Sequence, residues 1–310
     1  WYSHTPTHAI YDVLGGQSPQ TLVAEAALVL SSGSVKTALI VGGEALGNMR
    51  AAQRAGIPLN WSEKNEGDWT DRGLFNGPMI MSQTEMSHGL IDAMMYYGFI
   101  ETALRLKTGR TVSEHRDYMA NLIAPMSDVA AKNPMAMFQQ SFSPAEISTV
   151  TPANRNLISP YLKNMVAKDG VNQGAAVLMT TVAHAKSMGV AEDKWVYLRG
   201  HAEAQENLML DRSDLSRSLA MDLVIEAALK AAKAATGDID HTDIYSCFPC
   251  VVDQAATQLD RKSKPMTLTG GLPFFGGPGN NYSFMLFVKL LARVGKTMEA
   301  WGWHMAMAGG

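Results

Sequence analysis

The feature that most constrains this 310-residue chain is an amphipathic helix followed by a short apolar strand, a pairing that recurs along the sequence. Apolar residues at i, i+3, i+4 and i+7 predict a helix after Ser18-Pro19 that ends at Gly33. Residues 37–41 are then expected to form a strand buried on both faces, and residues 174–179 a second one. Because such strands need helices on both sides of their sheet, the sequence predicts a layered α/β fold.

The last third repeats the pattern and the middle interrupts it. Residues 195–199 and 243–246 are predicted strands, and residues 221–232 form one apolar helical face. Between about 50 and 169 the apolar strands give way to Trp, Met, Pro and Gly, with helical stretches such as 91–106. We therefore predict two similar halves with an inserted loop domain. The predicted boundaries are 1–48 with 171–190 for the first half, 49–170 for the loop domain and 191–310 for the second half.

Composition narrows the classes of partner. Charged residues make up 18% of the chain and the net charge is −3, so nothing favours nucleic acid or an anionic membrane as a partner. No apolar run approaches the roughly 20 residues of a membrane-spanning helix, and the first residues do not resemble a signal peptide. Only two cysteines are present, which fits a reducing compartment. We expect a cytoplasmic protein without membrane insertion.

Two glycine-rich segments are candidate binding loops. Residues 269–282 combine many glycines and prolines with aromatic residues, and such bare backbone allows close approach by a ligand. Residues 15–17 directly precede the first helix, whose free N–H groups and positive dipole end can hold an anion or oxyanion. Taken alone, a tight turn into the helix explains these glycines at least as well.

The cysteine pattern suggests a rival function. Cys247 and Cys250 follow a predicted strand and open a helix, the position of a thioredoxin-like redox pair. Two cysteines cannot complete a zinc tetrahedron, and the eight histidines lack ligand spacing beside a carboxylate. We expect no metal site.

Four segments form a recognisable series along the chain: Gly42-Gly43-Glu44 at a strand end, residues 169–176 like "DG…N-x-GAA", residues 238–248 like "DID…NEAF", and residues 270–278 like "GGAIALGHP". In their order and spacing they resemble the thiolase superfamily over essentially the whole chain. Within that superfamily, residues 15–20, Asn133-Pro134, residues 245–249 and residues 274–282 resemble the thiolase-like protein type 1 branch, whose members are commonly labelled acetyl-CoA acetyltransferases.

This resemblance implies a five-layer αβαβα fold whose loop domain covers coenzyme A. It implies an acyl-CoA as substrate or ligand, no cofactor, and association as a homodimer or with a second subunit. It also implies that the chain begins after the first strands of the family's first half and stops inside its last glycine-rich segment, at residues 309–310.

The departures from the family pattern concern the catalytic positions. Gly16 or Gln17 stands where thiolases carry the nucleophilic cysteine, and neither can form a thioester. Gly277 aligns with the loop histidine and Tyr245 with the asparagine of the second element. The second acid/base cysteine has no counterpart among residues 304–308. Ordinary thiolysis is therefore not expected.

Several functions remain open at this stage. The first is an acyltransferase relative of the acetyl-CoA acetyltransferases that lacks the usual cysteine and histidine. The alternatives are a retro-aldolase acting on 3-hydroxyacyl-CoA, a non-catalytic acyl-CoA binder or partner subunit, and a thiol oxidoreductase. Tyr245 is the candidate catalytic acid or base if its pKa is lowered locally, although a merely structural strand-end tyrosine is an equal interpretation. The predicted substrate loops contain Gly16, Gln17, Cys247, Phe248, Gly276, Gly277, Pro278 and Asn280.

Overall fold

The structure is a computed structural model that describes residues 6–61, 69–73, 76, 81–262, 266–294 and 302–305. The first five residues and residues 306–310, on which part of the sequence interpretation rests, lie outside the described residues. Of residues 302–305 only the backbone is described.

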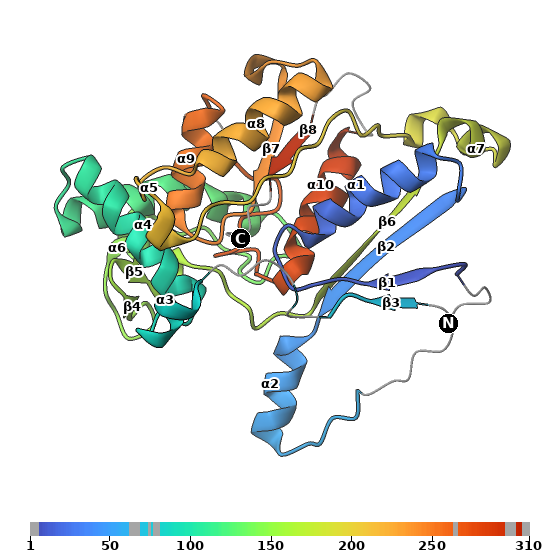
Figure 1. Ribbon diagram of the computed structural model, residues 1–310. Coiled ribbons are helices and arrows are strands. Elements are labelled where there is room, and N and C mark those ends of the chain that lie inside the picture. Colours follow the sequence, from blue (N-terminus) through green and yellow to red (C-terminus); the bar gives the residue numbers. More distant parts are fainter. Residues whose placement is uncertain are drawn as a thin grey trace.

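Helices and strands alternate in the outer parts of the chain, and helices dominate its middle (Figure 1). The strands are β1 (Ala9–Tyr11), β2 (Thr37–Glu44), β3 (Trp69–Asp71), β4 (Asn156–Ile158), β5 (Tyr161–Leu162), β6 (Gln173–Thr180), β7 (His241–Ile244) and β8 (Gly302–Met305). The α-helices are α1 (Ser18–Ser31), α2 (Leu46–Ala55), α3 (Gln83–Ser87), α4 (Ala93–Lys107), α5 (Val112–Ala131), α6 (Pro144–Ser148), α7 (Val182–Ser187), α8 (Leu219–Ala232), α9 (Pro249–Gln258) and α10 (Tyr282–Val294). The chain is thus a mixed α/β protein, as predicted.

The long ribbon β2–β6 carries the first helix of the chain. The two strands pair antiparallel from Thr37 opposite Thr180 to Glu44 opposite Gln173, and α1 and α10 pack on one side of the pair (Figure 1). Since side chains alternate along a strand, Ile40 is buried beneath the helices while Leu39 points the other way and is 52% exposed. The expectation that residues 37–41 are buried on both faces is therefore wrong for the described structure, and so is that for residues 174–179, where Leu178 is 66% exposed. Among the residues that the structure describes, helices cover only one face of this pair.

The second half shows one success and one error of the sequence interpretation. The predicted apolar helix is α8. The strand expected at 243–246 is β7, but it begins at His241 and ends at Ile244, so Tyr245 lies in the turn that leads into α9. Residues 195–199, predicted as a strand, are irregular. The chain there approaches α8 so closely that a Cβ on Gly200 would lie 2.6 Å from the Ala228 carbonyl oxygen. This segment therefore runs against a helix and has no partner strand among the described residues.

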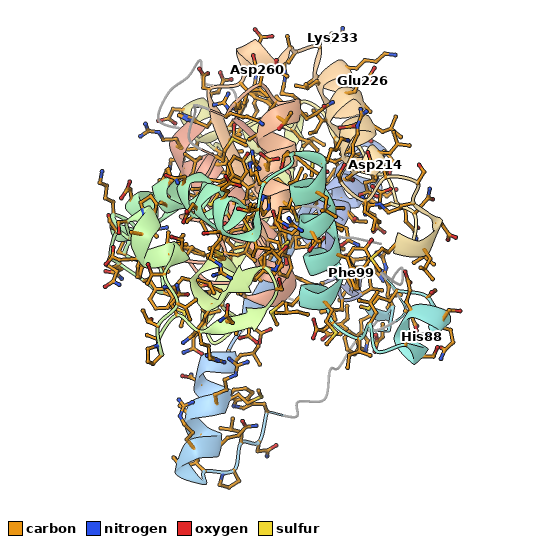
Figure 2. All side chains as sticks on the ribbon, turned by 90° about the vertical axis from the view of Figure 1, so that its left-hand side faces the viewer. His88, Phe99, Asp214, Glu226, Lys233 and Asp260 are labelled. Atoms are coloured by element: carbon orange, nitrogen blue, oxygen red, sulfur yellow. The ribbon has the colours of Figure 1, made fainter. Side chains whose placement is uncertain are left out.

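The middle of the chain forms a helical lobe beside α9. Its helices α4, α5 and α6 and the small β4–β5 pair lie together at one side of the molecule (Figure 1), and both α4 and α5 contact α9. The helix expected at 91–106 is α4, whose start is capped by Asp92. Figure 2 shows Phe99 on the outer side of this helix, whereas its neighbours Ile100 and Glu101 are buried. The lobe is thus fixed to the core at the helix that follows β7.

Candidate functional site

Two predicted site residues from distant parts of the chain, Tyr245 and Gly16, lie against each other. Tyr245 directly follows β7, and Gly16 lies two residues before α1. A Cβ placed on Gly16 would lie 2.7 Å from Cζ of Tyr245 and 2.9 Å from its hydroxyl oxygen. The tyrosine therefore fills the space that any side chain at position 16 would need.

The start of α1 offers hydrogen-bond donors at this point. Its N-cap is Gln17, whose side chain makes no capping hydrogen bond, and the N–H of Ser18 donates to the carbonyl of Gly15 at 3.0 Å. Among the described residues, the N–H groups of Gly16 and Gln17 have no hydrogen-bond acceptor. With the positive end of a 14-residue helix behind them, these groups favour a negatively charged or polarised oxygen.

The glycine-rich loop holds this turn in place. Asn280 accepts a hydrogen bond from the Gly15 N–H at 2.8 Å and donates one to the Val13 carbonyl at 2.8 Å. Ser283, at the start of α10, donates to the Gly16 carbonyl at 2.5 Å. These bonds join residues 13–16 to residues 280–283, more than 260 positions away, beside the contact between Gly16 and Tyr245.

Gly276, Gly277 and Pro278 are buried and serve to pack the loop. Gly276 has φ +118°, and a Cβ there would lie 2.7 Å from the Val171 side chain. Gly277 donates its N–H to the Lys168 carbonyl at 2.6 Å, and a Cβ there would lie 3.3 Å from that same oxygen. The bare backbone thus allows close approach to the segment before β6, rather than an opening at these positions.

The two cysteines do not have the environment of a redox pair. Cys247 and Cys250 are buried, and burial raises the pKa of the Cys247 thiol to about 12 and that of Cys250 well above its usual range. Phe248, between them, stacks on the Tyr97 ring with 4.5 Å between centroids. A thiol oxidoreductase needs a lowered thiol pKa, so this geometry argues against that function.

The Tyr245 side chain is partly buried, and this burial decides whether its phenol can act as an acid or as a base. Burial, with the neighbouring Cys247 second, raises its pKa well above the usual value. The condition of a lowered pKa is therefore not met, and the phenol stays protonated at neutral pH. Its hydroxyl has no hydrogen-bond partner in the part of the chain that the structure describes. Tyr245 is consequently a hydrogen-bond or proton donor rather than a base.

Asp243 is a site residue that the sequence interpretation missed. It is fully buried in β7, and its carboxylate accepts hydrogen bonds from the N–H groups of Leu268 and Thr269, both at 2.9 Å, and from the Thr267 hydroxyl at 3.0 Å. Burial raises its pKa to about 7. Asp243 thus fixes the entry to the glycine-rich loop against the strand that carries Tyr245. An acidic residue inside an apolar strand was the available signal.

In the described ranges, no helix is long and apolar enough to cross a membrane, and no group of three or more His, Cys, Asp or Glu side chains could hold a metal ion. A hollow of about 370 Å³ lies in the helical lobe between Phe142, Glu146, Asn154 and Asn164. None of the predicted site residues lines it.

Comparisons with known proteins give two informative likenesses. The chain is similar to a crystal structure of a monomeric SCP2-thiolase like protein type 1 from Mycobacterium smegmatis, with 36% identity and a TM-score of 0.84. The match covers 98% of this chain and 60% of that one, so the chain spans about three fifths of that protein's length. It also matches an Ltp2-ChsH2(DUF35) aldolase, with 14% identity, a TM-score of 0.69, and coverage of 96% and 75%, which shows the fold alone. No protein-family model and no curated protein matches the chain.

Proposed function

Because the chain belongs to the SCP2-thiolase-like proteins of type 1, we propose that it binds an acyl-CoA thioester where Tyr245 meets Gly16. The observation that carries this proposal is the packing of the tyrosine against the start of α1, where two N–H groups and a phenol are free to donate. In this proposal CoA lies between the helical lobe and the core, with its thioester end directed to Gly16 and Tyr245 rather than to the buried Gly277.

The thioester carbonyl is the group that these donors suit. Its oxygen becomes negative when the neighbouring carbon loses a proton or a carbon–carbon bond breaks, because the electron pair moves onto the carbonyl as an enolate. Fixed donors stabilise such a charge, and removing one typically costs a factor of about 10²–10³ in rate. The donors are the N–H groups of Gly16 and Gln17 at the helix start and the Tyr245 hydroxyl.

Covalent acyl transfer is not the chemistry that this site supports. Gly16 has no side chain, and the thiols of Cys247 and Cys250 are buried with raised pKa values. In this proposal the chain therefore shares the fold and the acyl-CoA ligand of the acyltransferases, but it forms no acyl-enzyme intermediate.

Retro-aldol cleavage of a 3-hydroxyacyl-CoA fits better. The bond between carbons 2 and 3 breaks, the 3-hydroxyl loses its proton as the aldehyde forms, and carbon 2 of the enolate takes up a proton to give acetyl-CoA. As the bond breaks, the 3-hydroxyl gives its proton to water, and the protonated Tyr245 donates a hydrogen bond to the enolate oxygen. Carbon 2 then takes a proton back from water, so Tyr245 is never required to act as a base. One of the similar structures is described as an aldolase, which favours this class without showing it. A non-catalytic binder would use the same donors and release no product.

Calorimetry and product analysis test the proposal. The protein is titrated with acetyl-CoA and with 3-hydroxybutyryl-CoA, and the mixture is analysed by mass spectrometry for acetyl-CoA and acetaldehyde. Tyr245→Phe should weaken binding about tenfold, the usual effect of losing one hydrogen bond to a polarised group. Tyr197→Phe, at a tyrosine that is 55% exposed, is the matched control and should change nothing. Absence of binding at millimolar ligand contradicts the proposal, and binding without product identifies a binder.

We also propose that the chain associates with a second copy of itself or with another subunit. One similar protein is described as monomeric and the aldolase is described by two components, so the relatives give both possibilities. Leu39 and Leu178 on the uncovered side of β2–β6 are 52% and 66% exposed and offer an apolar surface. Light scattering at high concentration should show a dimer or a copurifying subunit. A monomer without a companion would end this part of the proposal.

A further inference from the structure

A fully buried polar cluster lies where the helical lobe meets α9. Glu101 on α4, His115 on α5 and Tyr161 on β5 are each no more than 1% exposed. One carboxylate oxygen of Glu101 lies 2.7 Å from Nε2 of His115, and the other lies 3.1 Å from the Tyr161 hydroxyl. Burying a carboxylate costs folding free energy unless the carboxylate is paired and hydrogen-bonded, so the position of Glu101 in the core needs an explanation.

The proton positions in the cluster follow from its outer end. Arg110 Nη1 lies 3.4 Å from Nδ1 of His115, and a guanidinium can only donate. His115 Nδ1 therefore accepts, which places the ring proton on Nε2, where it is donated to Glu101. Arg110 also lies 3.5 Å from the centre of the Tyr118 ring. A guanidinium, an imidazole and a carboxylate thus follow one another from the partly buried edge inward.

The inner end of this series is the first turn of α9. The helix begins after Phe248, whose side chain makes no capping bond, and continues with Pro249, which has no N–H. The next N–H, that of Cys250, donates to the Glu101 carboxylate at 2.8 Å. A carboxylate from another helix therefore takes the role of the missing N-cap side chain at the positive end of α9.

We infer that Glu101 is a positioning residue for Tyr245, an inference that rests on the proposed function for the meaning of that position. Tyr245 lies in the turn at 245–248 that joins β7 to α9. Asp243 holds the strand side of the turn, and Glu101 holds the helix side through Cys250. With both ends fixed, the Tyr245 ring stays against Gly16.

Glu101→Gln tests the inference because it keeps the side-chain size and removes the charge. The new amide group must either face the Nε2–H of His115 with its own donors or turn its donors to the Cys250 N–H. Reversing the imidazole tautomer only moves the conflict to Arg110. One donor–donor contact therefore remains in every arrangement, and the first turn of α9 should loosen. Glu226→Gln, at an exposed residue that Figure 2 shows on the outside of α8, is the matched control.

The readout is the environment of residue 245 itself. In full-length protein without ligand, 3-fluorotyrosine replaces Tyr245, and its ¹⁹F resonance is recorded in the parent, Glu101→Gln and Glu226→Gln backgrounds. Glu101→Gln should displace or broaden the signal beyond its parent linewidth, whereas Glu226→Gln should leave it unchanged. Lowered thermal stability with an unmoved ¹⁹F signal would mean that Glu101 is only structural, and it would overturn the inference. Because no acyl-CoA is present, failure of the proposed function would leave this result unaffected.

A second measurement is made on the unaltered protein, and a variant serves only to assign its resonances. The chain has two cysteines, so ¹⁵N-cysteine labelling gives two amide resonances, which Cys247→Ser assigns. In the otherwise unaltered protein, the Cys250 amide should exchange with solvent at least about a hundredfold more slowly than in an unfolded chain, although first-turn amides of a helix usually lack a partner. Exchange of the Cys250 amide at close to the unfolded rate would refute the cap, and with it the positioning role of Glu101.

Discussion

Substitution of Gly16 by alanine is the most direct perturbation of the contact at the centre of the site. The added Cβ would lie 2.7 Å from Cζ of Tyr245, where an ordinary contact is 3.4–4 Å. The ring would have to retreat by about 0.7 Å, and forcing such a group into a packed place costs about 1–3 kcal/mol. Without the clash, Gly→Ala would be neutral or stabilise by about 0.4–1 kcal/mol, because the unfolded chain loses freedom.

A double-mutant cycle separates the clash from other effects. Urea unfolding, followed by tryptophan fluorescence, gives the free energy of unfolding of Gly16→Ala, Tyr245→Ala and the double variant. Removing the ring should relieve the clash, so the two changes should couple by about 1–3 kcal/mol. Gly237→Ala, where nothing lies within 4 Å of the new Cβ, is the control and should not destabilise. The reasoning is refuted if Gly16→Ala costs no more than Gly237→Ala and the coupling is below about 0.5 kcal/mol.

Three further predictions concern the groups around Tyr245. Asn280→Asp removes the donor to the Val13 carbonyl and should lower the free energy of unfolding by about 1–3 kcal/mol in urea melts; an unchanged midpoint would contradict the clamp. The folded pKa of Asp243, about 7, exceeds its unfolded value near 3.8, so stability should fall as pH rises from 4 to 7, and Asp243→Asn should flatten this slope; a rise instead would show an ionised carboxyl. Iodoacetamide at pH 8 should label neither Cys247 nor Cys250 until the protein unfolds, and rapid labelling would restore the thiol oxidoreductase as a candidate.

The local elements were predictable because their signals are local. Pro19 in the first turn of α1 and Gly33 with φ +78° after its end mark a helix that the apolar period confirms. The segment at 195–199 failed because a strand exists only with a partner, and no property of its own residues reveals whether one is present. The same applies to Leu39, whose exposure depends on what covers the second face of β2–β6.

The candidate site likewise contains residues that local motifs indicate and properties that depend on residues distant in sequence. Gly16, Tyr245 and Asn280 were predicted from motifs and the family resemblance. In the structure Tyr245 lies against Gly16, and Asn280 accepts a hydrogen bond from Gly15. Cys247 and Phe248 lie in the same turn, but they are buried against the helical lobe. The raised pKa of Tyr245 could not be predicted, because burial depends on residues distant in sequence. For the same reason, no local pattern indicates that a carboxylate on α4 caps α9.

The central claim is that a thioester carbonyl is held by the start of α1 and the Tyr245 hydroxyl without becoming attached to the protein. Acetyl-CoA labelled with ¹³C at the carbonyl tests it directly, since hydrogen bonding polarises the carbonyl and moves its resonance downfield. We predict a saturable downfield shift with the unaltered protein, a smaller shift with Tyr245→Phe, and no acetyl group added to the protein by mass spectrometry. An unmoved resonance at millimolar protein, or a covalently acetylated chain, would contradict the account.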